Sequence, residues 1–174
     1  EQSRYHEIVS VARDLLRVGP SGLGYLMAGA GIGAVISALT LASQAHVKRR
    51  RQFIFGCAAT FSLGLILLGT MKSFWGAFLV LIILGGTMVG ALALTNSTLQ
   101  VTSPPEYRGR IMSMYNLAVI GISPLGSLLA GAVAEALGVR TALALGGAIC
   151  LAYFLVLLAV LARSRRKVEP GIRD

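Results

Sequence analysis

The chain has 174 residues, of which 55% are hydrophobic and only 13% are charged, and its net charge is +9 at pH 7. A soluble domain carries about twice that charged fraction, and a soluble nucleic-acid-binding protein would spread its bases over one surface. Here the bases occur in short clusters between long apolar stretches. That distribution excludes both classes and is typical of an integral membrane protein.

Residues 1–18 predict a short amphipathic helix on the outer side of the membrane. Its apolar residues share one helical face: Ile8, Val9, Ala12, Leu15 and Leu16. The charged residues of this segment fall elsewhere on the helix. Because the chain begins at Glu1 and not at Met, we expect a fragment or a processed product.

Five uncharged stretches follow, and each is at least twenty residues long. About 20 apolar residues cross a hydrocarbon core of about 30 Å as a helix. The expected spans cover 20–44, 52–71, 74–99, 110–137 and 141–162. Their apolar runs are continuous, whereas the strands of a membrane barrel alternate between apolar and polar residues. We therefore predict an all-α integral membrane protein with a five-helix bundle over 19–163 and a basic tail over 164–174.

The distribution of Lys and Arg predicts the orientation of these spans. Eleven bases fall at one set of helix ends, in the cluster at 48–51, the connection at 100–110 and the tail, and five fall at the other. Cytoplasmic ends carry the excess of bases. We therefore expect a multi-pass protein of the plasma (inner) membrane with a cytoplasmic C-terminus.

Small residues recur at a spacing of four along several spans, in two parallel stripes on the fourth span, and they predict close helix packing. The glycines of these stripes are Gly29, Gly33, Gly86, Gly90, Gly126 and Gly131. The bilayer provides no hydrophobic force between helices, so small residues that let backbones approach help to hold a bundle together. The same smooth faces also suit helices that slide during a conformational cycle.

The connection "PPEYRGR" concentrates charge between two apolar spans. Pro104 and Pro105 end one helix and open the next. Glu106 is expected in the first turn of the new helix, where it would meet the positive end of the helix dipole and pair with Arg110. Together with Arg108 and Gly109 these residues form either a conformational latch or an ordinary turn at the membrane interface.

Two further features of the spans admit both a functional and a structural interpretation. Pro124 lies near the middle of the fourth span, where proline kinks a helix, and such kinks serve transport or merely packing. Polar residues inside the spans either line a pathway or bond neighbouring helices. The candidates for a pathway are Tyr25, Thr87, Asn96, Asn116 and Ser123.

No catalytic set of side chains can be assembled from the sequence, so we expect no enzyme activity, no cofactor and no metal site. Cys57 and Cys150 lie inside predicted spans and form no CxxC motif. We interpret both as small packing residues. The stretch "GAGIGA" lies in mid-span and has no acidic residue after it, so it does not indicate a dinucleotide site.

The segment "PPEYRGRIMSMYNLAVIGISPLGSLLAGAVAEALGVRTAL" resembles the penultimate helix of the major facilitator superfamily and the turn into the last one. The closest resemblance is to the bacterial branch of macrolide-efflux and enterobactin-export proteins. "GPSGLGYLMAGAGIGAVISAL" is similar to the eighth helix of that superfamily. The resemblance implies that the five spans are helices eight to twelve of a C-terminal half, and that residues 1–18 are the end of helix seven and its outer loop.

The resemblance implies part of a secondary transporter, a proton-coupled exporter of drugs or small metabolites. Its partners would be the lipid bilayer and the missing N-terminal helices of the same transporter. A membrane scaffold or interaction subunit without transport of its own is the alternative. No carboxylate lies in mid-span, and Glu135 lies near the outer end of the fourth span. A proton carrier would therefore lie outside these spans, or Glu135 would serve.

Overall fold

A computed structural model describes residues 20–43 and 50–168 of the chain. In chain order the elements are α2 (Pro20–Ser43), α3 (Arg50–Thr70), α4 (Phe74–Thr102), α5 (Arg108–Asn116), the π-helical turn η1 (Leu117–Gly121), α6 (Ile122–Leu137) and α7 (Val139–Val168). The expected amphipathic helix at 1–18 lies outside the described residues. So do Lys48 and Arg49 of the basic loop and residues 169–174 of the tail.

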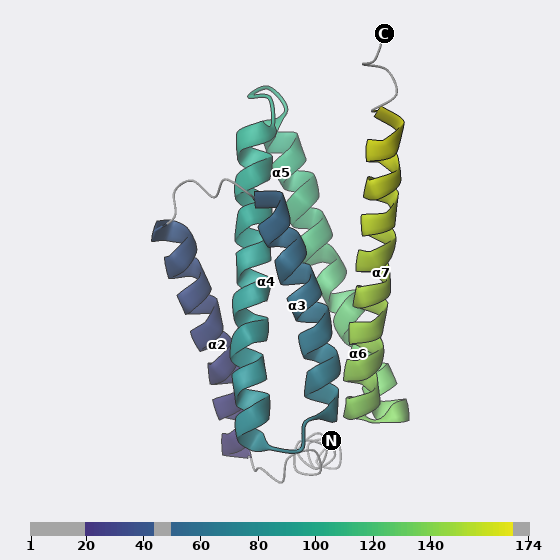
Figure 1. Ribbon diagram of the computed structural model, residues 1–174. Helices are drawn as coiled ribbons and strands as arrows, with labels where there is room; N and C mark the ends of the chain where they lie inside the picture. The colour runs from purple at the N-terminus through teal and green to yellow at the C-terminus, as the bar shows by residue number, and fades with distance from the viewer. Residues whose placement is uncertain (1–19, 44–49, 169–174) are drawn as a thin grey trace.

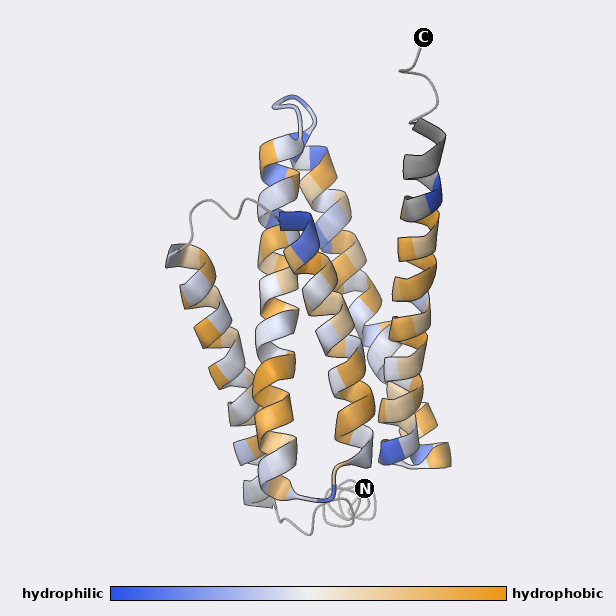
Figure 2. Cartoon of the chain, viewed as in Figure 1, coloured by the Kyte–Doolittle hydropathy of each residue, from blue (hydrophilic) through white to orange (hydrophobic). Residues whose placement is uncertain are grey.

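Five helices among the described residues are long and apolar enough to cross a membrane, with α5, η1 and α6 together forming the fourth. The prediction of an all-α membrane protein is therefore confirmed. The helices run alternately up and down (Figure 1). Hydrophobic residues fill the middle of the bundle, and hydrophilic residues gather at both ends (Figure 2).

Aromatic rings mark the end of the bundle at which α4 begins. Phe74 and Trp75 pack edge to face with ring centroids 5.7 Å apart, and Phe78 joins them with its centroid 6.1 Å from that of Trp75. At the opposite end the Arg51 guanidinium lies 5.4 Å from the centre of the Phe55 ring. Aromatic and basic side chains are the residues expected where a bundle meets the two membrane–water interfaces.

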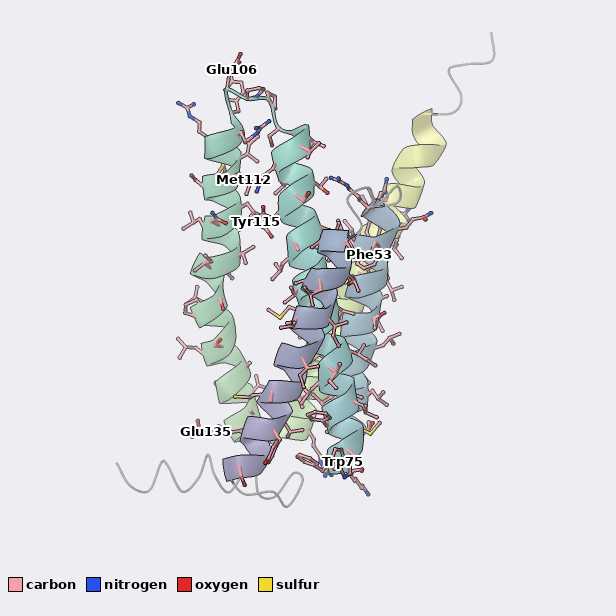
Figure 3. All side chains as sticks on the ribbon, turned by 90° about the vertical axis from the view of Figure 1, so that its left-hand side faces the viewer. Phe53, Trp75, Glu106, Met112, Tyr115 and Glu135 are labelled. Atoms are coloured by element: carbon pink, nitrogen blue, oxygen red, sulfur yellow. The ribbon has the colours of Figure 1, made fainter. Side chains whose placement is uncertain are left out.

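The core lies where α4 meets α2 and α3, and α3 also packs along α7 (Figure 1). Its buried apolar side chains are Cys57, Ala77, Val80, Leu84 and Leu94. By contrast, α5, η1 and α6 bury no residue. This column of three segments contacts α4 through α5 and α7 through α6. It stands beside the packed helices for most of its length (Figure 3).

The turn between α4 and α5 differs from the expectation. α4 ends at Thr102, and Ser103 is extended (φ −77°, ψ 133°) because the following proline disfavours helical geometry. The Tyr107 N–H then donates to the Pro104 carbonyl at 3.1 Å, which closes a four-residue turn with Pro105 at the position that proline favours. α5 begins only at Arg108, so the prediction that Glu106 lies in its first turn is wrong.

Pro124 lies three residues after η1. Proline provides no N–H for the helix ladder, and its ring crowds the carbonyl four residues earlier, which belongs to Ile120. A π-helical turn is one of the ways in which a helix absorbs such a defect. The structure therefore shows a local widening of the helix just before Pro124, and a kink at the proline itself stays a prediction.

Candidate functional site: a polar-rimmed cavity between α4 and α5

A cavity of about 550 Å³ lies between α4 and the segment formed by α5 and η1. Its lining residues are Val89, Leu92, Ala93, Asn96, Ser97, Gln100, Tyr115, Asn116, Val119 and Ile120. Its volume is within the range of pockets that enclose a small molecule, about 300–1,000 Å³. One wall is the central helix of the packed core, and the other is the column that buries no side chain.

The lining changes from apolar to polar along the bundle. On α4, Val89 and Leu92 lie toward the middle of the helix, and Asn96 and Gln100 follow toward the end that meets the 103–107 turn. The other wall runs the opposite way, so Asn116 lies toward the turn and Ile120 toward the middle. The two gradients coincide in space because the helices are antiparallel. The cavity therefore has an apolar floor and a hydrogen-bonding rim.

Tyr115 joins the two walls of the cavity. Its side chain points from α5 toward α4 (Figure 3), and its hydroxyl donates to the Leu92 carbonyl at 3.3 Å. This carbonyl is part of α4, so the bond links the two helices at the depth of the cavity. A bond of that length to a neutral acceptor is weak. The contact between the walls is therefore easily broken.

Polar groups of the rim remain free to bind a ligand. On α4 the Gln100 Nε2 donates to Asn96 Oδ1 at 2.5 Å, and among the described residues the Asn96 amide NH₂ and the Gln100 carbonyl oxygen have no other partner. Within residues 20–43 and 50–168, the side chains of Ser97 and Asn116 make no hydrogen bond. Amides both donate and accept, so this rim matches neutral polar groups of either kind.

Among the residues that the structure describes, no charged side chain lines the cavity. The nearest bases along α5 are Arg108 and Arg110, about two turns before Asn116, and both are exposed. Glu135 lies at the opposite end of the column, and Glu106 lies in the turn (Figure 3). A ligand in the cavity would therefore meet hydroxyls, amides and hydrocarbon.

The structure brings two of the five predicted pathway residues, Asn96 and Asn116, together in this cavity. Thr87 lies on α4 beyond the cavity floor, and its hydroxyl donates to the carbonyls of Ile83 and Leu84, at 3.0 Å each. Tyr25 and Ser123 are exposed side chains on other parts of the bundle. None of these three lines the cavity, and their place in a pathway stays a prediction.

Three polar lining residues, Ser97, Gln100 and Tyr115, were not among the predicted pathway residues. A signal for them was present in the sequence. Asn96 and Gln100 lie four residues apart and share a helical face, as Tyr115 and Val119 do on the other wall. A polar stripe at helical spacing in an otherwise apolar span indicates a face turned toward a cavity or another helix.

Glycines hold α2 against α4. A Cβ at Gly33 would collide with the Ile82 carbonyl, and a Cβ at Gly85 would collide with the Ala30 carbonyl. A Cβ at Gly86 would lie 3.1 Å from the Gly33 oxygen, and one at Gly90 would lie 2.8 Å from Ser37 Oγ. These backbones are therefore closer than any other residue would allow.

The remaining predicted glycines divide into two groups. A Cβ at Gly29 would lie 2.9 Å from the Phe78 ring on α4, so this glycine lies in the same interface. Around Gly126 and Gly131, no atom among the described residues comes within 4 Å of the position of a Cβ. The stripe on α6 therefore faces open space, and its role in packing stays a prediction.

The charged turn shows no latch in this structure. Among the described residues Glu106 makes no ion pair with Arg108 or Arg110, and Gly109 has open space around it. Arg110 and Glu106 do not share a regular helix, because α5 begins between them at Arg108. The expected pairing of Glu106 with Arg110 is therefore absent, and the proposed latch stays a prediction.

Comparison with known proteins places this architecture in a family. The family model described as "Transmembrane secretion effector", of the major facilitator superfamily, matches residues 8–170. The multidrug efflux pump Tap of Mycolicibacterium fortuitum is 27% identical over 122 residues, which cover 70% of this chain and 30% of the pump. The chain therefore aligns with less than a third of the curated relative that it matches. No solved structure matches significantly.

Proposed function

Because this chain belongs to the transmembrane secretion effector family of the major facilitator superfamily, we propose that it forms the C-terminal part of a secondary active exporter of small molecules. The observation that carries this proposal is the cavity between α4 and α5. It lies open on one side between two apolar helices, it has the volume of a ligand pocket, and polar side chains line one end of it. A scaffold without transport activity would need no such cavity.

The exposed side chains of the column support the proposal that further helices pack against this bundle. Large apolar side chains project from it along its whole length, with Met114, Leu117, Leu128 and Leu129 at least 70% exposed. In a bilayer such side chains meet lipid or another helix. In the proposed transporter, helices that precede this chain would pack against the column and close the cavity on its open side.

The proposal places the 103–107 turn, the start of α3 and the end of α7 in the cytoplasm of a bacterial cell, with the protein in the inner membrane. The described bases at these ends are Arg50, Arg51, Arg108, Arg110, Arg163, Arg165, Arg166 and Lys167, whereas Lys72 and Arg140 lie at the other ends. Labelling of Arg50→Cys and Lys72→Cys with an impermeant maleimide tests the orientation. Reaction of both from the same side would contradict it.

We propose proton antiport as the energy source. No carboxylate lies at mid-membrane depth within the described spans, and Glu135 lies at the outer end of α6. Intramembrane acids are the usual proton carriers, so the carrier would lie in the preceding helices or be Glu135. Export that persists in Glu135→Gln and stops when the pH gradient is collapsed would assign the carrier to those helices.

Export itself is tested with the complete reading frame in a bacterial strain that lacks its own efflux pumps. The protein should lower the cellular accumulation of at least one member of a panel of fluorescent small molecules. Asn96→Leu and Asn116→Leu should abolish this effect at an unchanged membrane level, and Ser127→Ala, outside the cavity, should not. A panel that accumulates equally with and without the protein would favour a scaffold.

A further inference from the structure

We infer that the cavity between α4 and α5 binds an uncharged amphipathic molecule, with its apolar body toward the middle of the membrane and its hydrogen-bonding group at the rim. The inference rests on the proposed function, because it takes this cavity to be the part of the transport path that holds substrate. It goes beyond that function by naming the chemical class of the substrate and its orientation.

The polarity gradient sets the orientation of the ligand. The floor side chains Val89, Val119 and Ile120 provide only hydrocarbon, and Asn96, Ser97 and Asn116 at the rim provide hydroxyl and amide groups. Burying a polar group against the floor would leave it without a hydrogen-bond partner, which is unfavourable. The reverse orientation would also leave the amides of the rim against an apolar surface. Only one orientation satisfies both ends.

Because the described lining carries no charged side chain, we expect an uncharged ligand. A cation or an anion at this depth would lose its hydration without meeting an opposite charge, which is costly inside a membrane protein. The charged groups nearest the rim, Arg108 and Arg110, lie outside the lining and about two turns away along α5. These bases disfavour a cation, and neither is among the residues that line the cavity, so an anion between Asn96 and Asn116 would meet no basic side chain of the lining.

Neutral amides and hydroxyls, in contrast, meet a neutral polar group at little cost. Asn116 and Ser97 lie on opposite walls and make no hydrogen bond within the part of the chain that the structure describes. A ligand carbonyl, ether, hydroxyl or oxide oxygen between them replaces water without breaking a bond inside the protein. Both side chains are exposed, so their replacement removes a ligand contact and leaves no buried group unsatisfied.

Three probes with similar aryl bodies and different charge test the inference. They are triphenylphosphine oxide, which is neutral and a strong hydrogen-bond acceptor, tetraphenylphosphonium, a cation, and tetraphenylborate, an anion. Binding is measured on the protein expressed from its complete reading frame and embedded in lipid nanodiscs, and the signal of empty nanodiscs is subtracted. We expect the oxide to bind at least tenfold more tightly than either ion.

Substitutions at the rim assign the binding to the cavity. Asn116→Leu and Ser97→Ala should each weaken binding of the oxide about three- to tenfold, the effect of one hydrogen bond. Asn116→Asp should weaken the oxide and raise the affinity for tetraphenylphosphonium. Ser127→Ala, on the same column and outside the cavity, should change neither. Maleimide labelling of the buried Cys57 during heating verifies that each variant is folded, in a background that carries Cys150→Ser because Cys150 is exposed.

Either of two results would overturn the inference: an ion that binds the unmodified protein as tightly as the oxide, or oxide binding that is unchanged in both Asn116→Leu and Ser97→Ala. These results are distinct from failure of the proposed function. A protein that binds the oxide as expected and exports nothing would refute transport alone. A protein that exports other molecules and binds the oxide no better than the ions would refute the ligand class alone.

Discussion

Two surfaces of this bundle carry stripes of small residues. The stripe between α2 and α4 is tightly packed, whereas the stripe on α6 faces open space. Between α2 and α4 the glycines at 33 and 85 bring backbone against backbone, so that no Cβ could be added. On α6 the glycines at 126 and 131 meet nothing within 4 Å among the described residues. Small residues at helical spacing therefore show that a close approach is possible. They do not show whether the partner belongs to the same set of helices.

The comparison also explains the position of the cavity. Where glycines pack, α2 and α4 leave no space between them. The column of α5, η1 and α6 has bulky exposed side chains and buries none of them, so it stands off from α4. The space between α4 and the column is the cavity, and polar side chains line one end of it. The central helix α4 therefore has one surface packed closely against α2 and another that faces the column. The cavity lies at the second surface, between a wall held by the core and a wall with few contacts.

The largest effect is expected at the packed surface. Gly33→Leu would drive a side chain into the Ile82 carbonyl, and overpacking of this kind costs about 3 kcal/mol. Little folded protein should then survive extraction in detergent, as measured by size-exclusion chromatography. Gly31→Leu is the matched control, since Gly31 is on the same helix with open space around it. Equal recovery of both variants would mean that α2 and α4 are not in contact.

The second prediction concerns the glycines of α6, which face open space in this structure. In this chain alone, Gly126→Leu and Gly131→Leu should change the free energy of unfolding by no more than about 0.5 kcal/mol, because their surroundings are open. In the proposed transporter the same substitutions should reduce export strongly if a preceding helix packs on the stripe, because that helix would be displaced. Denaturant titration and an export assay measure the two quantities. Full export in both variants would show that the stripe faces lipid.

A smaller effect is expected at the contact between the walls. Tyr115→Phe removes the bond to the Leu92 carbonyl and should lower stability by about 0.5–1 kcal/mol, seen as a lower melting temperature. Tyr153→Phe is the control, because the Tyr153 side chain is 71% exposed on α7. If both variants melt at the same temperature as the unmodified protein, the bond does not hold the column.

The smallest effect on stability is expected at the charged turn. Arg108→Lys and Arg110→Lys keep the charge and should leave the membrane level of the protein unchanged. If these arginines hold helix ends together in one state of the transport cycle, lysine should impair export, because it lacks the planar fork of arginine. Arg163→Lys, at the end of α7, serves as a control. Parental export in the two turn variants would identify the arginines as membrane anchors.

The fold was largely predictable from the sequence, because length and hydropathy determine which segments can span a bilayer. Each of the five described helices lies within a few residues of its expected range, apart from extensions of up to six residues in the polar ends of α7. Turn chemistry was predicted less well. The tandem prolines do follow the end of α4. Pro105, however, lies in the four-residue turn closed by Tyr107 and not in the first turn of the next helix, so Glu106 lies outside α5.

The candidate site was predictable only in part. Asn96 and Asn116 could be singled out because amides are rare in apolar spans, but their meeting depends on how far the column stands from α4. Gly85 was missed because the spacing of four selects Gly86 with Gly90, whereas in the structure both adjacent glycines contact α2. The sequence shows which side chains are polar. It does not show the distance between two helices, because that distance results from all their contacts together.

Gly138 separates α6 from α7 as a single residue, and its φ of +84° is one that glycine adopts without strain. A link this short ties the foot of the column to α7, while the far end is joined to α4 by a small turn. A column joined to α7 through one glycine is able to tilt about Gly138 as a lever. Asn116 is 22 residues from that pivot, about 33 Å along a helix, so a tilt of about 5° moves it by about 3 Å. A slight inclination of this column would thus widen the whole cavity by about the width of a water molecule, while the end of the column at Gly138 stays in place.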